Sequence, residues 1–115
     1  MAAVLVVDDD EAVRELLRLN LELEGHEVSE AADGRAALDQ LDRLHRDVLL
    51  LDMMMPGING ADVLRQLAGL SPRPCVIAYS ASEVHLGLAR ELGADTTVLK
   101  SGDLGPLLNA LEACP

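Results

Sequence analysis

Apolar residues follow two kinds of pattern along this chain. Short continuous runs at residues 4–7 and 48–51 are typical of strands that are buried on both faces of a parallel sheet. Residues 75–79 and 97–99 predict two more strands, and a weaker alternation at residues 27–31 predicts a short edge strand. Between these runs the apolar residues recur at the spacing of a helix, so the chain is expected to alternate strands with helices.

The expected helices are defined by five apolar stripes. These are Val13, Leu16, Leu17 and Leu21; Ala37, Leu38, Leu41 and Leu44; Val63, Leu64 and Leu67; Val84, Leu88 and Leu92; and Leu104, Leu107, Leu108 and Leu111. Asn59 is the expected cap of the third helix, and Pro106 fits the first turn of the fifth. Five strands alternating with five helices, without a linker or repeat, predict an α/β fold with a doubly wound parallel sheet and right-handed crossovers.

Polar side chains stand where four of the predicted strands end. Asp8 and Asp9 follow the first strand, Asp52 closes the central one, and Ser80 and Lys100 end the last two. Open parallel sheets bind ligands at this edge, and three converging carboxylates must either protonate or share a hard cation such as Mg²⁺. A metal with open positions, beside an ammonium and a hydroxyl, suits phosphoryl transfer. Asp52 stands alone and is the expected nucleophile, while Asp8 and Asp9 are better placed to share the metal.

Each of these side chains also has a purely structural interpretation. Asp52 by itself could cap the next helix, and Asp10 is interpreted as the cap of the first helix rather than a metal ligand. Ser80 and Glu83 match a capping box, so the Ser80 hydroxyl could serve the fourth helix instead of a phosphoryl group. Lys100 could be a solvated lysine after an edge strand. The coincidence of all four strand ends favours a site.

Composition narrows the classes of partner. With 20 acidic and 9 basic residues the net charge is −11, which repels nucleic-acid backbones and anionic membranes. Tyr79 is the only aromatic residue available for stacking on bases. We therefore expect no direct nucleic-acid binding and no membrane association. No export signal and no apolar run of about 18–20 residues is present, which predicts a cytoplasmic protein. The length suits one domain, residues 1–115.

The remaining reactive side chains are not expected to form sites. Cys75 and Cys114 lack metal-binding spacing and are expected to be reduced and structural. The methionines at residues 53–55 are expected to form a loop wall beside Asp52. The histidines are too scattered for a catalytic base or a metal set and are expected at the surface: His26, His45 and His85.

Three segments together resemble the receiver domains of two-component response regulators, and the resemblance covers the whole chain. They are VVDDDEAVRELL, LLLDMMMPGINGADVL and GADTTVLK. The resemblance implies a flavodoxin-like fold with strand order 2-1-3-4-5. It implies that Asp52 accepts a phosphoryl group from a sensor histidine kinase or phosphotransfer protein. It further implies that Asp9, Asp52 and the Met54 main-chain carbonyl hold Mg²⁺, with Asp8 acting mainly through water. Ser80 and Lys100 would bind phosphoryl oxygens.

The same resemblance implies a switch that catalyses its own phosphorylation and dephosphorylation and controls an output domain or partner protein, as a monomer or a phosphorylation-dependent homodimer. Two positions depart from the usual pattern of such domains. Thr97 stands where they usually carry an aromatic switch residue. Ser101 stands where many have a proline after the lysine, so the Lys100–Ser101 peptide could be cis or trans. An interaction module that no longer needs phosphate is the alternative. A metal-dependent phosphatase with a DxDxT motif is disfavoured because the second acid is missing after Asp52.

Overall fold

Strands and helices alternate along residues 2–115, the part of the chain described by this computed structural model. The strands are β1 (Ala3–Val7), β2 (Glu27–Ala31), β3 (Val48–Asp52), β4 (Cys75–Ser80) and β5 (Thr96–Leu99). The helices are α1 (Glu11–Leu23), α2 (Gly34–Arg43), α3 (Gly60–Leu67), α4 (Glu83–Glu91) and α5 (Gly105–Ala113). The predicted element order is confirmed, with small differences in the bounds.

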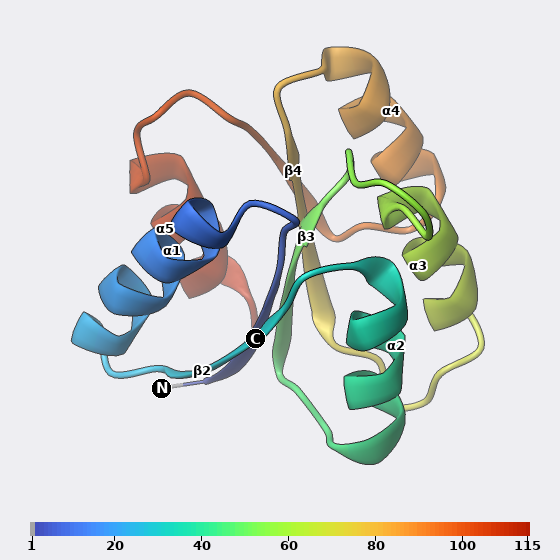
Figure 1. The fold of residues 1–115 in the computed structure, drawn as a ribbon, viewed down its shortest axis with the longest axis horizontal. Coiled ribbons are helices and arrows are strands. Elements are labelled where there is room, and N and C mark those ends of the chain that lie inside the picture. Colours follow the sequence, from blue (N-terminus) through green and yellow to red (C-terminus); the bar gives the residue numbers. More distant parts are fainter. Residues whose placement is uncertain (1) are drawn as a thin grey trace.

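The five strands form one parallel sheet in the order β2-β1-β3-β4-β5. Helices α1 and α5 cover one face, and α2, α3 and α4 cover the other, which gives the three layers visible in Figure 1. Val7 pairs with Leu51 and Asp52 with Tyr79, so the carboxyl ends of the central strands reach the same edge. The predicted doubly wound fold and strand order are confirmed.

Alternate residues of each central strand enter different halves of the core. In β3, Leu49 and Leu51 pack with side chains of α2, α3 and α4, while Val48 and Leu50 pack with α1 and α5. All four are buried. Burial on both faces explains why the strand is a continuous apolar run rather than an alternation.

Two of the predicted helix caps are confirmed. The Asp10 carboxylate accepts hydrogen bonds from the first turn of α1, and Asn59 and Asp62 form a reciprocal capping box at α3. At α4 the cap is Ser82, whose hydroxyl accepts from the main-chain N–H of His85. The capping interpretation of Ser80 is therefore wrong, because α4 begins two residues later than that interpretation requires.

Three residues assigned to apolar stripes are exposed. Leu16 is 52% exposed because α1 turns Leu17 and Leu21 towards the sheet and leaves its neighbour at the rim. Leu44 lies beyond the end of α2. Val84 is 80% exposed because it belongs to the first turn of α4, whose buried residues are Leu86 and Ala89. The helices were located correctly, but their buried faces were predicted less well.

The expectation that Cys75 and Cys114 are reduced is wrong in this structure. Cys75 begins β4, Cys114 follows α5, and the two form a disulfide with a Cα–Cα distance of 6.0 Å. Helix α5 brings residues 39 positions apart in sequence together at the edge of the sheet opposite the acidic side chains. Among residues 2–115 only Ser71–Pro72 is a cis peptide, so Lys100–Ser101 is trans. None of the described helices is both long and apolar enough to cross a bilayer.

Candidate functional site at the carboxyl edge of the sheet

The structure brings all the predicted site residues to one edge of the sheet. Asp8 and Asp9 leave the end of β1, and Asp52 and Ser80 are the last residues of β3 and β4. Lys100 follows β5, and its main-chain N–H donates to the Ser80 carbonyl. This convergence follows from the parallel sheet, because parallel strands that are in register end together.

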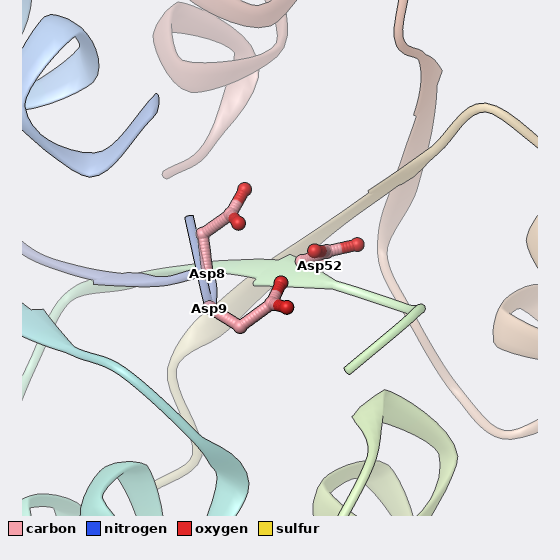
Figure 2. A group of neighbouring side chains, drawn as sticks. All are labelled: Asp8, Asp9 and Asp52. Carbon is pink, nitrogen blue, oxygen red and sulfur yellow. The ribbon is translucent and has the colours of Figure 1, made fainter. Parts of the chain in front are cut away.

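Three carboxylates form the centre of the site. Asp8, Asp9 and Asp52 each offer one oxygen, and these atoms lie within 4.8 Å of one another. Asp8 and Asp52 are buried and Asp9 is exposed, and Figure 2 shows all three at the ends of their strands. Mg²⁺ prefers oxygen ligands and usually keeps several waters, and a cluster open on one side leaves positions for water or a substrate. The residues present therefore fit a hard divalent cation.

Asp8 is fully buried and accepts three hydrogen bonds. Its Oδ1 accepts from the main-chain N–H of Asp10 at 2.9 Å. Its Oδ2 accepts from the Tyr79 hydroxyl at 2.7 Å and lies 3.4 Å from the Lys100 Nζ. A buried carboxylate is costly unless such donors compensate for lost water. Asp8 is thus held in one orientation by groups from three elements.

Asp52 has fewer partners and a perturbed pKa. Its Oδ1 accepts from the main-chain N–H of Met54 at 3.0 Å, and its Oδ2 lies 3.4 Å from the Lys100 Nζ. The pKa of Asp52 is raised to about 6, chiefly by burial. The Met54 N–H opposes this shift, the charge of Asp8 adds to it, and the charge of Lys100 opposes it. The carboxylate is therefore poorly stabilised as an anion, and a nearby cation would favour its charged form.

Lys100 is positioned between the two buried acids. Its Nζ lies 3.4 Å from a carboxylate oxygen of both Asp8 and Asp52, and 4.8 Å from the centre of the Tyr79 ring. The side chain is 35% exposed, so the ammonium has room to turn outward. The interpretation of Lys100 as a solvated lysine without a role in the site is not supported by these contacts.

Comparison with known sequences decides the family. Residues 4–112 match the family described as the response regulator receiver domain. The chain belongs to this family. The resemblance recognised in its three motifs is confirmed.

Several curated relatives support the assignment. The receiver domain is 38% identical over 114 residues to the sensory transduction protein RegX3 of Mycobacterium tuberculosis, covering 98% of this chain and 50% of that protein. It is 41% identical over 98 residues to the DNA-binding response regulator MtrA of Mycolicibacterium smegmatis, covering 84% of this chain and 43% of that protein. The chain thus spans about half the length of the curated relatives it matches.

Solved structures show the same fold. The response regulator protein TrrA of Thermotoga maritima, solved in complex with Mg²⁺ and BeF, has a TM-score of 0.92 at 30% identity, with 100% of both chains covered. The chemotaxis protein CheY4 of Vibrio cholerae has a TM-score of 0.87 at 28% identity and covers 100% of this chain and 99% of its own. Receiver domains bind Mg²⁺ at an acidic cluster of the kind found here.

Sequence reasoning missed the part that Tyr79 plays in the receiver domain. Its ring is buried among side chains of α1 and α5, and its hydroxyl reaches Asp8, which is 71 residues away in the sequence. Burial and the charge of Asp8 raise the pKa of Tyr79 far above its usual range, so the phenol remains a donor. The available signal was a lone aromatic residue immediately before Ser80.

The methionine loop was predicted only in part. Met54 is exposed beside the site, whereas Met53 and Met55 are buried in the core rather than forming a loop wall. After the loop, the start of α3 packs closely against the end of β3: a Cβ on Gly60 would lie 2.8 Å from the Asp52 carbonyl oxygen and the Met53 Cα. Any larger residue at position 60 would push the start of α3 away from Asp52.

Proposed function

We propose that Asp52 is the phosphoacceptor of this receiver domain and takes the phosphoryl group from a phosphohistidine of a sensor histidine kinase or phosphotransfer protein. The observation that carries the proposal is the pairing of Asp52 with Lys100 beside the Asp8–Asp9 pair. The other two acids fit the role less well, because Asp8 already accepts three hydrogen bonds and Asp9 is not on the central strand. Asp52 combines burial with a weakly stabilised charge, which suits a nucleophile.

The metal proposed for the site is Mg²⁺, which would be held by Asp9, Asp52 and the main-chain carbonyl of Met54, with Asp8 acting mainly through water. The cluster of carboxylate oxygens supports this assignment. When bound, Mg²⁺ would supply positive charge that keeps the acids ionised and stabilises the phosphoryl oxygens. The solved complex of TrrA with Mg²⁺ and BeF is consistent with such a site in a relative.

The chain's own groups account for the rest of the transfer. An Asp52 oxygen attacks phosphorus, the phosphorus–nitrogen bond breaks, and its electron pair remains on the departing imidazole. The Lys100 ammonium can turn from the carboxylates to a phosphoryl oxygen. The Ser80 oxygen already accepts the main-chain N–H of Ser82 at 3.0 Å, which leaves its own hydrogen free to donate to another phosphoryl oxygen. Attack of water on the phosphorus of the acyl phosphate would release inorganic phosphate and restore the Asp52 carboxylate, and the proposal includes that the domain catalyses both its phosphorylation and this dephosphorylation.

The output of the phosphorylated domain is proposed to lie outside residues 1–115. RegX3 and MtrA are about twice as long as their matched segments, and MtrA is described as DNA-binding. The net charge of −11 favours an output domain or protein partner over direct DNA contact by this chain. The proposal includes a cytoplasmic location, supported by the family, and a monomer or phosphorylation-dependent homodimer.

A small phosphodonor with and without Mg²⁺ tests the proposal, with the mass of the intact protein as the readout. The parent should gain one phosphoryl group only with the metal, and Asp52→Asn should gain none. Asp39→Asn, an exposed acid on α2, is the matched control and should label like the parent. Labelling of Asp52→Asn at the parent's rate would overturn the assignment. Absence of labelling in the parent would favour the alternative of a phosphorylation-independent interaction module.

A further inference from the structure

The Tyr79 hydroxyl makes the shortest side-chain contact to the acidic cluster. Its 2.7 Å hydrogen bond to Asp8 joins two buried partners, on β4 and just after β1. A hydrogen bond to an ionised acceptor in a low-dielectric site is stronger than a neutral one. Tyr79 therefore fixes the orientation of an acid whose side chain is buried in the structure.

The same ring also contacts the lysine of the site. The Lys100 Nζ lies 4.8 Å from the ring centre, and it shares the Asp8 Oδ2 with the phenol as an acceptor. Tyr79 thus constrains Asp8 through its hydroxyl and Lys100 through its ring face. The two contacts can be separated experimentally, because phenylalanine keeps the ring and removes only the hydroxyl.

We propose that Tyr79 is a positioning residue for Mg²⁺-dependent phosphorylation, which holds Asp8 in the orientation required by the metal and Lys100 between Asp8 and Asp52. The inference rests on the proposed function of the site. Partners that orient the acidic groups around a metal typically contribute 10–100-fold to its affinity. Tyr79 itself touches neither the metal position nor the phosphoryl group in this scheme.

The first test uses the phenol as its own reporter. Tyr79 is the only aromatic residue in the chain, so its near-ultraviolet absorbance and fluorescence arise from one side chain. Titration of the parent with Mg²⁺ should change this signal with the same midpoint as binding measured by calorimetry. In Asp8→Asn the metal-free signal should differ from the parent's, and the Mg²⁺-dependent change should be lost. A parent signal that does not respond to bound Mg²⁺ would overturn the proposal.

The second test separates the hydroxyl from the ring. Tyr79→Phe should weaken Mg²⁺ binding by about tenfold and slow labelling at low Mg²⁺, while saturating Mg²⁺ restores the parent's rate. Tyr79→Leu should also lower the rate at saturating Mg²⁺, since Lys100 loses the ring. Thr97→Val is the matched control: it removes a hydroxyl from β5, away from the carboxylate cluster, and it should leave the Mg²⁺ midpoint unchanged.

The outcomes distinguish this inference from the function on which it rests. If the parent is not labelled at Asp52, the proposed function fails, whatever the phenol signal shows. If the parent is labelled and Tyr79→Phe binds Mg²⁺ as tightly as the parent, the role of Tyr79 fails and the phosphoacceptor assignment stands. Equal thermal unfolding of the variants would show that a change in affinity is not a consequence of unfolding.

Discussion

The buried charge of Asp52 predicts that the metal-free receiver domain becomes more stable when this charge is removed. Burial raises the pKa of Asp52 from 3.8 to about 6. One pKa unit corresponds to about 1.4 kcal/mol, so ionising Asp52 costs the folded state on the order of 3 kcal/mol. Asparagine still accepts from the Met54 N–H but loses the attraction of Lys100, so we expect Asp52→Asn to raise the unfolding free energy by about 1–3 kcal/mol at neutral pH.

The pH dependence gives this prediction its sign. Between the unfolded pKa of 3.8 and the folded pKa of about 6, the folded protein binds the proton more tightly than the unfolded chain does. The contribution of Asp52 to stability therefore falls as pH rises through this window and stays low above it. The advantage of Asp52→Asn should be complete near neutral pH and should disappear towards pH 4.

Thermal unfolding in a metal chelator is the assay. A gain of 1 kcal/mol should raise Tm by about 4 °C for a domain of this size. Asp39→Asn removes the same charge from an exposed position and should change Tm little at any pH. Excess Mg²⁺ should stabilise the parent more than Asp52→Asn, because binding to the folded state alone adds stability. A metal-free variant that melts below the parent at neutral pH would refute the reasoning.

Three further predictions concern the metal, the switch and the disulfide. Calorimetry should show that Asp9→Ala weakens Mg²⁺ binding more than Asp10→Ala does. Asp10→Ala should instead lower the unfolding free energy by about 1 kcal/mol, because it removes the cap of α1. Equal losses of affinity would contradict the assigned ligands. With Mg²⁺ and beryllofluoride, backbone amide NMR should show larger shifts at residues 80–83 than at residues 97–99; equal shifts would show that the missing aromatic does not limit coupling. Under oxidising conditions, Cys114→Ser should have an unfolding free energy lower than the parent's by up to about 4 kcal/mol, because the disulfide is lost. Adding reductant to the parent should cause the same loss, and neither change should alter the labelling rate. An oxidised parent that is no more stable than the variant would contradict a bond between these cysteines.

The parts predicted well from the sequence are those in which a local pattern reflects a global constraint. The continuous apolar run of β3 required burial on both faces, and only a covered parallel sheet supplies that environment. Parallel strands in register then place their ends together, so Asp52, Ser80 and Lys100 could be grouped without knowledge of any contact. The family motifs added the order of the strands.

The parts predicted poorly depend on how separate elements meet. The disulfide required knowing that α5 returns Cys114 to the start of β4, and the Tyr79 hydrogen bond spans 71 positions in the sequence. Leu16 and Val84 have the spacing of buried residues, but the rotation of each helix against the sheet leaves them exposed. Periodicity identifies a face, whereas its limits depend on the neighbouring elements.

The location of the only aromatic ring bears on how the proposed phosphorylation would reach the surface. Thr97 on β5 pairs with Ala78, one residue before Tyr79, and it is too small to fill the space that an aromatic switch residue would occupy. The ring of Tyr79 points instead into the cluster beneath α1 and α5, where its hydroxyl is held by Asp8. A ring with a buried, charge-assisted hydrogen bond is poorly suited to swing between two positions. The Ser80 hydroxyl oxygen accepts the main-chain N–H of Ser82, the residue that caps α4. A phosphoryl group that draws Ser80 inward would therefore act directly on the start of α4, and the segment after Ser80 is the best placed to carry the conformational change.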